Sequence, residues 1–292
     1  MLSTFSCTKA SSGSHVGKYV LTEKVRENVF EAVSLHSGKH LLCKVFPISR
    51  YAQTLAVYSQ LPVQPNLHHP SEIIFEHSTA YVFFEHAYGN MCRYVQTVGC
   101  LCEDEALRLF HQIVSVVAHC HHNGVILPRL KLKNFAFKNK EKTNVALNKL
   151  KDAYIIEKSD VMSGTHSCPF YMSPESLQPG SLYSGKASNV WTLGVMLYAI
   201  LVGRYPFTHR NLNDLYNKIQ MCKFKLPDLL SPKAKCLIRS ILRSDPSERL
   251  TAEEILSHPW FSSTSYSLYM WRKMFYKERD QEVPSLEQIA IN

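Results

Sequence analysis

Positively charged side chains occupy three positions of this sequence that could do chemistry. Lys44 lies in an apolar stretch, Arg129 lies in the segment Leu127–Asn134, and Lys149 opens the run Lys-Leu-Lys at 149–151. Neither a guanidinium nor an ammonium group has a lone pair that accepts a proton, and both repel a divalent metal ion. These side chains are therefore suited to neutralising a phosphate directly, and unsuited to general-base catalysis or to holding Mg²⁺.

A second chemically capable group is the run His119–His122, in which Cys120 lies among three histidines. Both residue types bind zinc, so a metal site is one interpretation of the run. The other interpretation is structural, because the run ends an amphipathic pattern and histidine favours the negative end of a helix dipole. No distant pair of cysteines completes a zinc site, so the sequence favours the structural interpretation and no metal.

The composition is typical of one large domain or of two lobes sharing a core. Of the 292 residues, 45% are hydrophobic. The longest apolar run, Val190–Gly203, is too short to cross a membrane and predicts a buried core helix. Met1–Ala10 lacks the basic start and apolar core of a secretory signal. The nine cysteines are scattered, which is typical of reduced thiols in the nucleus or cytoplasm.

The formal net charge of +9 has three interpretations. The simplest is a solvated basic surface, and the next is an anionic partner such as an acidic peptide. Nucleic-acid binding is the least favoured, because the sequence has neither an aromatic-basic module nor a zinc-ligand spacing. We expect no nucleic-acid or membrane partner.

The elements that position the three cations fall into two parts. Strand patterns and one short helix predict a small β-rich N-lobe at 18–87, after a loose tail at 1–17. Helical periodicity predicts a larger C-lobe at 88–261, followed by a C-terminal tail at 262–292. The predicted strands are Lys18–Leu21, Val29–Leu35, His40–Phe46 and Tyr81–Glu85, and the predicted helices are Ser49–Gln60, Ala106–Cys120, Val190–Val202, Leu212–Gln220, Pro232–Leu242 and Ala252–Leu256. This pattern indicates an α+β protein.

Four landmarks in the second half resemble those of the protein kinase fold. Leu127–Asn134 is similar to the catalytic loop His-Arg-Asp-Leu-Lys-x-x-Asn. Asn189–Val195 resembles the start of the central helix of the kinase C-lobe. Ser173-Pro174-Glu175 is similar to Ala-Pro-Glu, and Arg249 stands where kinases keep the arginine that pairs with this glutamate. The resemblance implies a bilobal protein-kinase-like fold with a structural Glu175–Arg249 ion pair.

The same resemblance implies a dismantled ATP site. Arg129 replaces the catalytic aspartate, and Lys149 replaces the aspartate that holds Mg²⁺. The stretch 25–30 has no glycine to approach phosphate, and the helix predicted at 49–60 has no glutamate for Lys44, the vestigial nucleotide lysine. Loss of a general base alone costs about 10²- to 10⁴-fold in rate. We therefore expect a pseudokinase with no cofactor, and weak metal-independent binding of ATP is the lesser alternative.

Within the kinase fold, the sequence resembles the Tribbles pseudokinases. The segments that carry this resemblance are Tyr81–Asn90, Val117–His121, Leu130–Leu132, Tyr183–Lys186, Leu201–Phe207, Ser231–Leu242 and Glu248–Phe261. Family members generally keep an aspartate where Arg129 stands and Ser-Leu-Glu at 149–151, so this chain departs further from active kinases than the family pattern does.

The tail contains a short segment that resembles the Tribbles peptide for a constitutive-photomorphogenic-type E3 ubiquitin ligase. The residues that carry it are Asp280, Gln281, Val283 and Pro284, with Glu282 between them. An acidic residue offers charge-assisted hydrogen bonds, and Val-Pro presents an extended apolar pair at low ordering cost. The resemblance implies recruitment of the ligase.

A second segment resembles the family's docking site for MAP kinase kinases. It contains Ile255, Leu256, His258, Pro259, Trp260 and Phe261. Ordinary kinases also end their last helix with His-Pro-Trp-Phe, so the sequence favours Trp260 and Phe261 as caps of the core over a role in docking.

Together these resemblances imply an inactive scaffold of the nucleus and cytoplasm. It would bring the ligase to C/EBP-type transcription factors and would modulate MAP kinase signalling. The substrate would bind the C-lobe near the altered activation segment, 152–168. Two alternatives stay open, namely a pure inhibitor of kinase signalling that needs no ligase and a weakly active, atypical Ser/Thr kinase.

Overall fold

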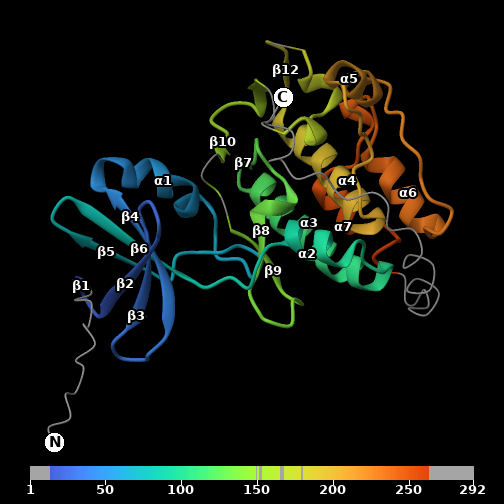
Figure 1. The fold of residues 1–292 in the computed structure, drawn as a ribbon. Coiled ribbons are helices and arrows are strands. Elements are labelled where there is room, and N and C mark those ends of the chain that lie inside the picture. The colour runs from blue at the N-terminus through green and yellow to red at the C-terminus, as the bar shows by residue number, and fades with distance from the viewer. Residues whose placement is uncertain (1–13, 149, 151–152, 165–167, 179, 263–292) are drawn as a thin grey trace, which may run out of the picture. The chain divides into compact units, whose positions relative to one another are not determined.

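The computed structural model describes residues 14–148, 150, 153–164, 168–178 and 180–262, with only the backbone described at 50 and 52–55. These residues form two compact units, which we call the N-lobe and the C-lobe (Figure 1). The N-lobe holds the described residues up to Tyr58 together with His68–His86, and the C-lobe holds Ser59–Leu67 and everything from Ala87 onward. The expected α+β, bilobal class is confirmed.

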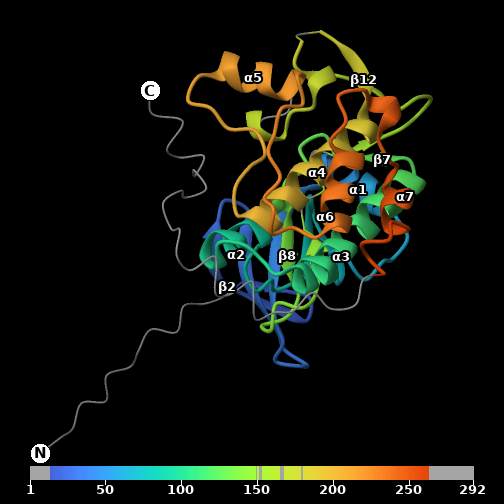
Figure 2. The same ribbon diagram turned by 90° about the vertical axis from the view of Figure 1, so that its right-hand side faces the viewer.

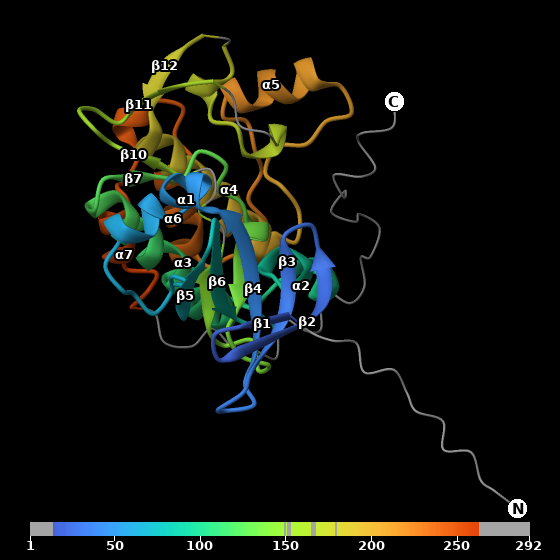
Figure 3. The same ribbon diagram turned by 90° about the vertical axis from the view of Figure 1, so that its left-hand side faces the viewer.

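The N-lobe is a six-stranded antiparallel sheet with one helix (Figure 3). Its strand order is β1-β2-β3-β4-β6-β5. The helix α1 packs its Tyr51 and Tyr58 against Val82 and Phe84 of one sheet face. The elements are β1 (Ser14–Val16), β2 (Tyr19–Arg26), β3 (Val29–Ser34), β4 (His40–Pro47), α1 (Ile48–Gln60), β5 (Glu72–Glu76) and β6 (Thr79–Glu85).

The sheet curls so that its first strands meet its last. Lys18 forms an ion pair of 2.8 Å with Glu72 of β5, and the hydroxyl of Tyr19 donates to the same carboxylate at 2.6 Å. Gly17, between β1 and β2, has a φ of +53°, and a Cβ there would lie 2.8 Å from Ile74. The strand β1 corrects the expectation of a loose tail through residue 17, because its pairing with β2 places it inside the folded N-lobe.

The C-lobe is mainly helical, and α4 lies at its centre. Helix α3 packs against α4 and α7, and α6 packs against α4 (Figure 2). The helices are α2 (Met91–Val98), α3 (Glu103–His122), α4 (Gly185–Val202), α5 (Leu212–Gln220), α6 (Pro232–Ile241) and α7 (Ala252–Leu256). Short 3-10 turns occupy η1 (Leu132–Asn134), η2 (Pro169–Tyr171), η3 (Pro174–Ser176) and η4 (Pro246–Glu248).

Three two-stranded ribbons complete the C-lobe. They pair β7 (Val125–Ile126) with β10 (Tyr154–Ile155), β8 (Phe135–Phe137) with β9 (Val145–Leu147), and β11 (Val161–Ser163) with β12 (Leu182–Ser184). Helix α4 is long and apolar enough to cross a membrane, but 83% of that window is buried within the protein. It is thus the buried core helix expected from the sequence, beginning five residues earlier than predicted.

The segment Ser59–Leu67 belongs to the C-lobe, although the sequence suggested an N-lobe that runs without interruption to residue 87. The ring of His119 in α3 contacts the carbonyl of Pro62 at 3.1 Å. Asn66 donates to Gln112 of α3 at 3.1 Å and to the carbonyl of Val145 in β9 at 2.9 Å. These bonds explain the reassignment, because they join the segment to C-lobe elements far away in sequence.

Candidate functional site at the kinase-like loop

The loop Leu127–Asn134 is fastened to the core by one buried amide. Asn189 of α4 accepts a hydrogen bond from the backbone N–H of Leu127 at 2.9 Å and donates to its carbonyl at 2.8 Å. The ring Nε2 of His121 lies 3.2 Å from the same Asn189 oxygen. Buried hydrogen bonds of this kind leave little freedom to the bonded backbone, so the start of the loop has a defined position.

Beyond Leu127 the loop alternates between buried apolar and outward-facing charged side chains. Leu130 and Leu132 are 2% and 3% exposed, whereas Arg129 and Lys133 are exposed and Lys131 is half-buried. Lys131 has an extended backbone, with a φ of −166° and a ψ of 162°. The loop therefore presents a guanidinium at the position where a kinase presents its catalytic carboxylate.

The metal-binding chemistry of a kinase does not fit the residues around this loop. The side-chain oxygen of Asn134 is buried and accepts no hydrogen bond from the described residues. Kinases use this asparagine as a Mg²⁺ ligand together with carboxylates. No group of three or more His, Cys, Asp or Glu side chains gathers around a common point in the described part of the chain. A single amide oxygen in a loop that also carries Arg129, Lys131 and Lys133 is a poor site for Mg²⁺. Lys149 lies outside the described residues.

In the N-lobe, the amine of Lys44 is placed against an aromatic ring. Its Nζ lies 4.0 Å from the centroid of the Phe84 ring. Lys44 is on β4, directly opposite Val82 of β6. A cation over a ring face is stabilised by about 0.5–2 kcal/mol. In an active kinase the corresponding lysine instead forms an ion pair with a glutamate.

The stretch 25–30 forms an ordinary hairpin turn. Arg26 of β2 pairs with Val29 of β3, which leaves a two-residue turn in which Asn28 has a φ of +55°. The carbonyl of Asn28 accepts a hydrogen bond from the backbone N–H of Val45 in β4 at 2.9 Å. A phosphate-binding loop instead directs several free N–H groups at its ligand. The turn therefore offers no cradle for phosphate.

The described part of the activation segment is tied to the N-terminus of α4. Asp160 accepts a hydrogen bond of 2.5 Å from the hydroxyl of Ser184 and one of 3.4 Å from the backbone of Lys186. The hydroxyl of Tyr183 donates to the carbonyl of Gly164 at 2.8 Å. Because β11 and β12 also pair here, residues 160–164 have a defined position on the C-lobe.

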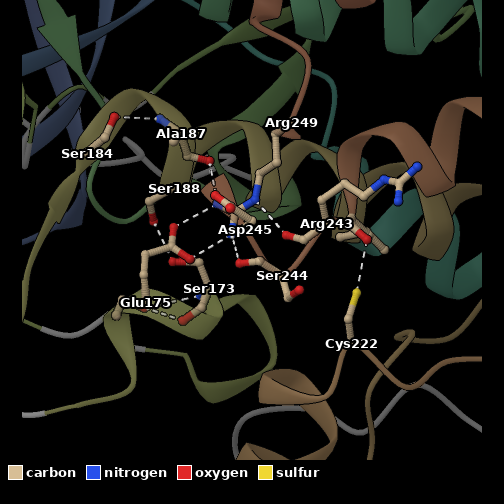
Figure 4. A network of polar contacts seen from close by, with 12 residues as sticks. Ser173, Glu175, Ser184, Ala187, Ser188, Cys222, Arg243, Ser244, Asp245 and Arg249 are labelled. Atoms are coloured by element: carbon tan, nitrogen blue, oxygen red, sulfur yellow. Dashed lines mark hydrogen bonds and ion pairs between the residues drawn. The ribbon is translucent and has the colours of Figure 1, made fainter. Parts of the chain in front are cut away.

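The ion pair expected between Glu175 and Arg249 is present (Figure 4). Arg249 also donates to the carbonyls of Ala187, Arg243 and Ser244 at 3.1, 2.8 and 3.2 Å. Its guanidinium lies 5.0 Å from the Trp191 ring centroid. The network joins η3 to α4 and to the segment after α6, so the C-lobe keeps the architecture that supports a kinase active site.

Similarity to a family model and to three known proteins bears on these observations. The protein kinase domain family matches residues 27–261. Tribbles homolog 2 of Canis lupus familiaris is 54% identical over 250 residues, covering 85% of this chain and 73% of that protein. Tribbles homolog 1 of Homo sapiens is 46% identical over 283 residues, covering 96% and 74%. Tribbles homolog 3 of Rattus norvegicus is 39% identical over 276 residues, covering 94% and 79%.

The chain belongs to the Tribbles pseudokinase family. The family expected from the sequence is thereby confirmed. The chain has the protein kinase fold, and Arg129 lies within that domain.

The segment proposed for MAP kinase kinases in this Tribbles chain is divided between core and surface. Ile255 and Trp260 are fully buried, whereas Leu256, His258 and Phe261 are half-buried and Pro259 is exposed. The indole of Trp260 donates to the carboxylate of Glu103 at 3.0 Å. Trp260 is therefore part of the core, as the structural interpretation held. Of the residues expected to dock, only Leu256, His258, Pro259 and Phe261 are accessible to a partner.

Glu103 is the residue of this region that sequence reasoning underestimated. In the sequence it is the first of three acids that precede the helix predicted at Ala106–Cys120. In the structure it is 7% exposed, and besides Trp260 it accepts bonds of 2.7 Å from both the N–H and the hydroxyl of Ser231. One carboxylate thus joins the first turns of α3 and α6 to the end of the domain. Nothing in the local pattern distinguishes it from the neighbouring Asp104 and Glu105.

The histidine run 119–122 and the tail motif complete the survey of expected sites. His119 contacts Pro62, His121 contacts Asn189, and His122 is exposed, so these rings have separate surroundings. Asp280, Gln281, Val283 and Pro284 of the tail lie outside the described residues.

Proposed function

We propose that this Tribbles chain is a catalytically inactive scaffold. It recruits a constitutive-photomorphogenic-type E3 ubiquitin ligase through its tail and holds a C/EBP-type transcription factor on its C-lobe for ubiquitination. It acts in the nucleus and cytoplasm and also modulates MAP kinase signalling. The observation that supports inactivity best is the loop that Asn189 fastens in place while it presents Arg129 instead of a base.

The loss of catalysis follows from the charge of the groups around the reaction. A guanidinium does not accept the proton of a substrate hydroxyl. Replacing the base costs about 10²- to 10⁴-fold, and each missing electrostatic contact to the transition state costs about a further 10²- to 10³-fold. The test is transfer of labelled phosphate from ATP to a general substrate with Mg²⁺ or Mn²⁺. We expect none, and transfer that disappears with Lys44→Ala would establish the weak-kinase alternative.

Recruitment of the ligase rests on the Tribbles-like peptide in the tail. Asp280 lies 19 residues beyond Phe261. A flexible chain of that length has a root-mean-square reach of about 25 Å, enough for a separate β-propeller to bind without meeting the domain. Val283 and Pro284 would fill an apolar pocket, and Asp280 would meet its basic rim. Such peptides concentrate affinity in few residues.

The decisive experiment compares two double variants of the full chain. Val283→Ala with Pro284→Ala should abolish ligase capture and protect the transcription factor from degradation. Ile289→Ala with Ile291→Ala, a matched apolar loss outside the motif, should change neither. If the first variant captures the ligase as well as the unaltered chain does, the second candidate function, a pure inhibitor of kinase signalling, becomes the better account.

Modulation of MAP kinase signalling is supported by the surface part of 255–261. Leu256 and Pro259 flank the buried Trp260 on the outside of the C-lobe. The double variant Leu256→Ala with Pro259→Ala should weaken binding of a MAP kinase kinase while ligase capture persists. Unchanged binding would remove this part of the proposal.

A further inference from the structure

The basic charge of the chain is concentrated in one short region. Residues 123–142 contain six lysines or arginines and one acid, Glu141. These 20 residues therefore carry +5 of the net +9, and the other 272 residues carry only +4. The region contains the whole loop Leu127–Asn134. A local excess of this kind attracts an anion much more strongly than an evenly spread charge does.

Three of these cations lie within five consecutive residues of the loop, and each is exposed or half-buried. Leu130 and Leu132 are buried in the C-lobe, whereas Arg129 and Lys133 are exposed and Lys131 is half-buried. The loop is held at both ends, by Asn189 at Leu127 and by the bond of 2.8 Å from the N–H of Asn148 to the carbonyl of Asn134. A ligand would therefore not have to order the loop, which lowers the cost of binding.

The charges of Lys131 and Lys133 affect the pKa values of nearby thiols. Burial raises the pKa of Cys92, and the charges of Lys133 and Lys131 act against that rise. Burial likewise raises the pKa of Cys168, against which the Phe170 backbone and the charge of Lys131 act. Lys131 thus acts on a thiol of α2 and on a thiol of the activation segment. Lys131 and Lys133 also act together on Cys92, which indicates that they share one neighbourhood.

We propose that Arg129, Lys131 and Lys133 form a metal-free binding site for a phosphorylated side chain of a protein segment. Arginine matches phosphate with parallel N–H···O bonds, and lysine adds a compact charge. In an active kinase the residue at the place of Arg129 meets the hydroxyl that receives the phosphoryl group. If the substrate side chain already carries a phosphate, the catalytic carboxylate of a kinase repels it. The Arg129 guanidinium at the same position attracts it.

A protein segment fits the observations better than a nucleotide does. The three cations lie on a single lobe and need no contribution from the other. The N-lobe turn at 27–28 is closed by its bond to β4 and offers no phosphate cradle, and Lys44 lies over Phe84. The inference is independent of ligase recruitment, because it concerns neither the tail nor ubiquitination.

The test uses the full chain and an immobilised library of degenerate peptides with a fixed phosphoserine or phosphothreonine. The same library without phosphate is the reference. We expect at least about tenfold enrichment on the phosphorylated library, equivalent to about 1.4 kcal/mol. Inorganic phosphate should compete, and Arg129→Asp should abolish the enrichment while the melting temperature is unchanged. Arg129→Lys should retain part of it, because the charge remains and the fork is lost.

Lys140→Asp provides the matched control. It makes the same charge change at another exposed position of the basic region, on the β8–β9 turn, and should leave the enrichment within about twofold. Equal losses from Lys140→Asp and Arg129→Asp would show that the basic region binds polyanions without a specific site, and would overturn the proposal. So would equal retention on the two libraries. A chain that binds metal-free ATP more tightly than the phosphorylated library would overturn the assignment to a protein segment.

Discussion

Glu175 and Arg249 form a two-pronged ion pair in which both nitrogen–oxygen distances are 2.7 Å. The Arg249 side chain is 1% exposed and the Glu175 side chain is 15% exposed. The arginine donates its other hydrogen bonds to backbone carbonyls, so the pair is buried and almost fully satisfied (Figure 4). Because it joins η3 to the segment after α6, it acts on the stability of the C-lobe rather than on chemistry.

Removal of one member of this pair should be costly. Arg249→Ala strands the Glu175 carboxylate in a desolvated place and should lower the free energy of unfolding by about 3–5 kcal/mol. Arg243→Ala is the control, because Arg243 lies 3.9 Å from Glu248 in an exposed pair worth below about 1 kcal/mol. Urea unfolding followed by circular dichroism measures both. Equal midpoints for Arg249→Ala and the unaltered chain would contradict the prediction.

Asn189→Leu should release the start of the kinase-like loop. The substitution leaves the buried N–H and carbonyl of Leu127 without their partners, at about 1–3 kcal/mol for each. Hydrogen exchange at Leu127 should speed up accordingly. Asn217→Leu, on the exposed side of α5, should leave that amide protected. Protection of Leu127 in the Asn189 variant would mean that the loop is held by other contacts.

Trp260→Ala should fail as a test of kinase docking because it damages the fold. Trp260 is fully buried, and truncation of a buried tryptophan costs about 3–5 kcal/mol. It also leaves Glu103 with only its Ser231 donors. Trp260→Phe should cost less, since the ring remains and only the indole bond is lost. Thermal unfolding of the two variants separates these effects, and an undiminished melting temperature for Trp260→Ala would contradict the assignment of Trp260 to the core.

Stability should fall as the medium becomes acidic, in part through His121. Burial lowers the pKa of His121 from its ordinary value of 6.5, although the Asn189 bond and the charges of Glu253 and Asp160 raise it and Lys186 lowers it further. Below about pH 6.5 the unfolded chain therefore binds more protons than the folded one. The free energy of unfolding then rises with pH through this range and levels off above it.

The corresponding measurement is urea unfolding at several pH values between 5 and 8. His121→Gln should flatten the acid side of the profile, whereas His122→Gln, an exposed neighbour, should leave its slope unchanged. Some slope should remain in the first variant, because burial also lowers the pKa of His258. A profile that is equally steep with and without His121 would rule out this contribution.

The sequence by itself predicted the class of fold and the altered chemistry of the loop. Helical periodicity placed α3, α5 and α7 to within three residues, since each buries one apolar stripe. Helices α5 and α7 also begin at side-chain caps, Asn211 and Thr251. The identities of Arg129 and Lys149 excluded a general base and a metal-binding carboxylate without any coordinates, because those properties belong to the side chains themselves.

Only the tertiary structure decided which residues share a site. β1 and β5 were missed although each pairs with the next strand along the chain, because strand propensity in so short a segment is weak and depends on its packing in the sheet. The curl of the sheet, which brings Lys18 to Glu72, is likewise set by tertiary packing. Glu103 and Asn189 looked like ordinary polar helix residues, yet packing buries both and supplies their partners across 128 and 62 residues. Burial and long-range hydrogen bonding are properties of the folded chain, and no local pattern encodes them.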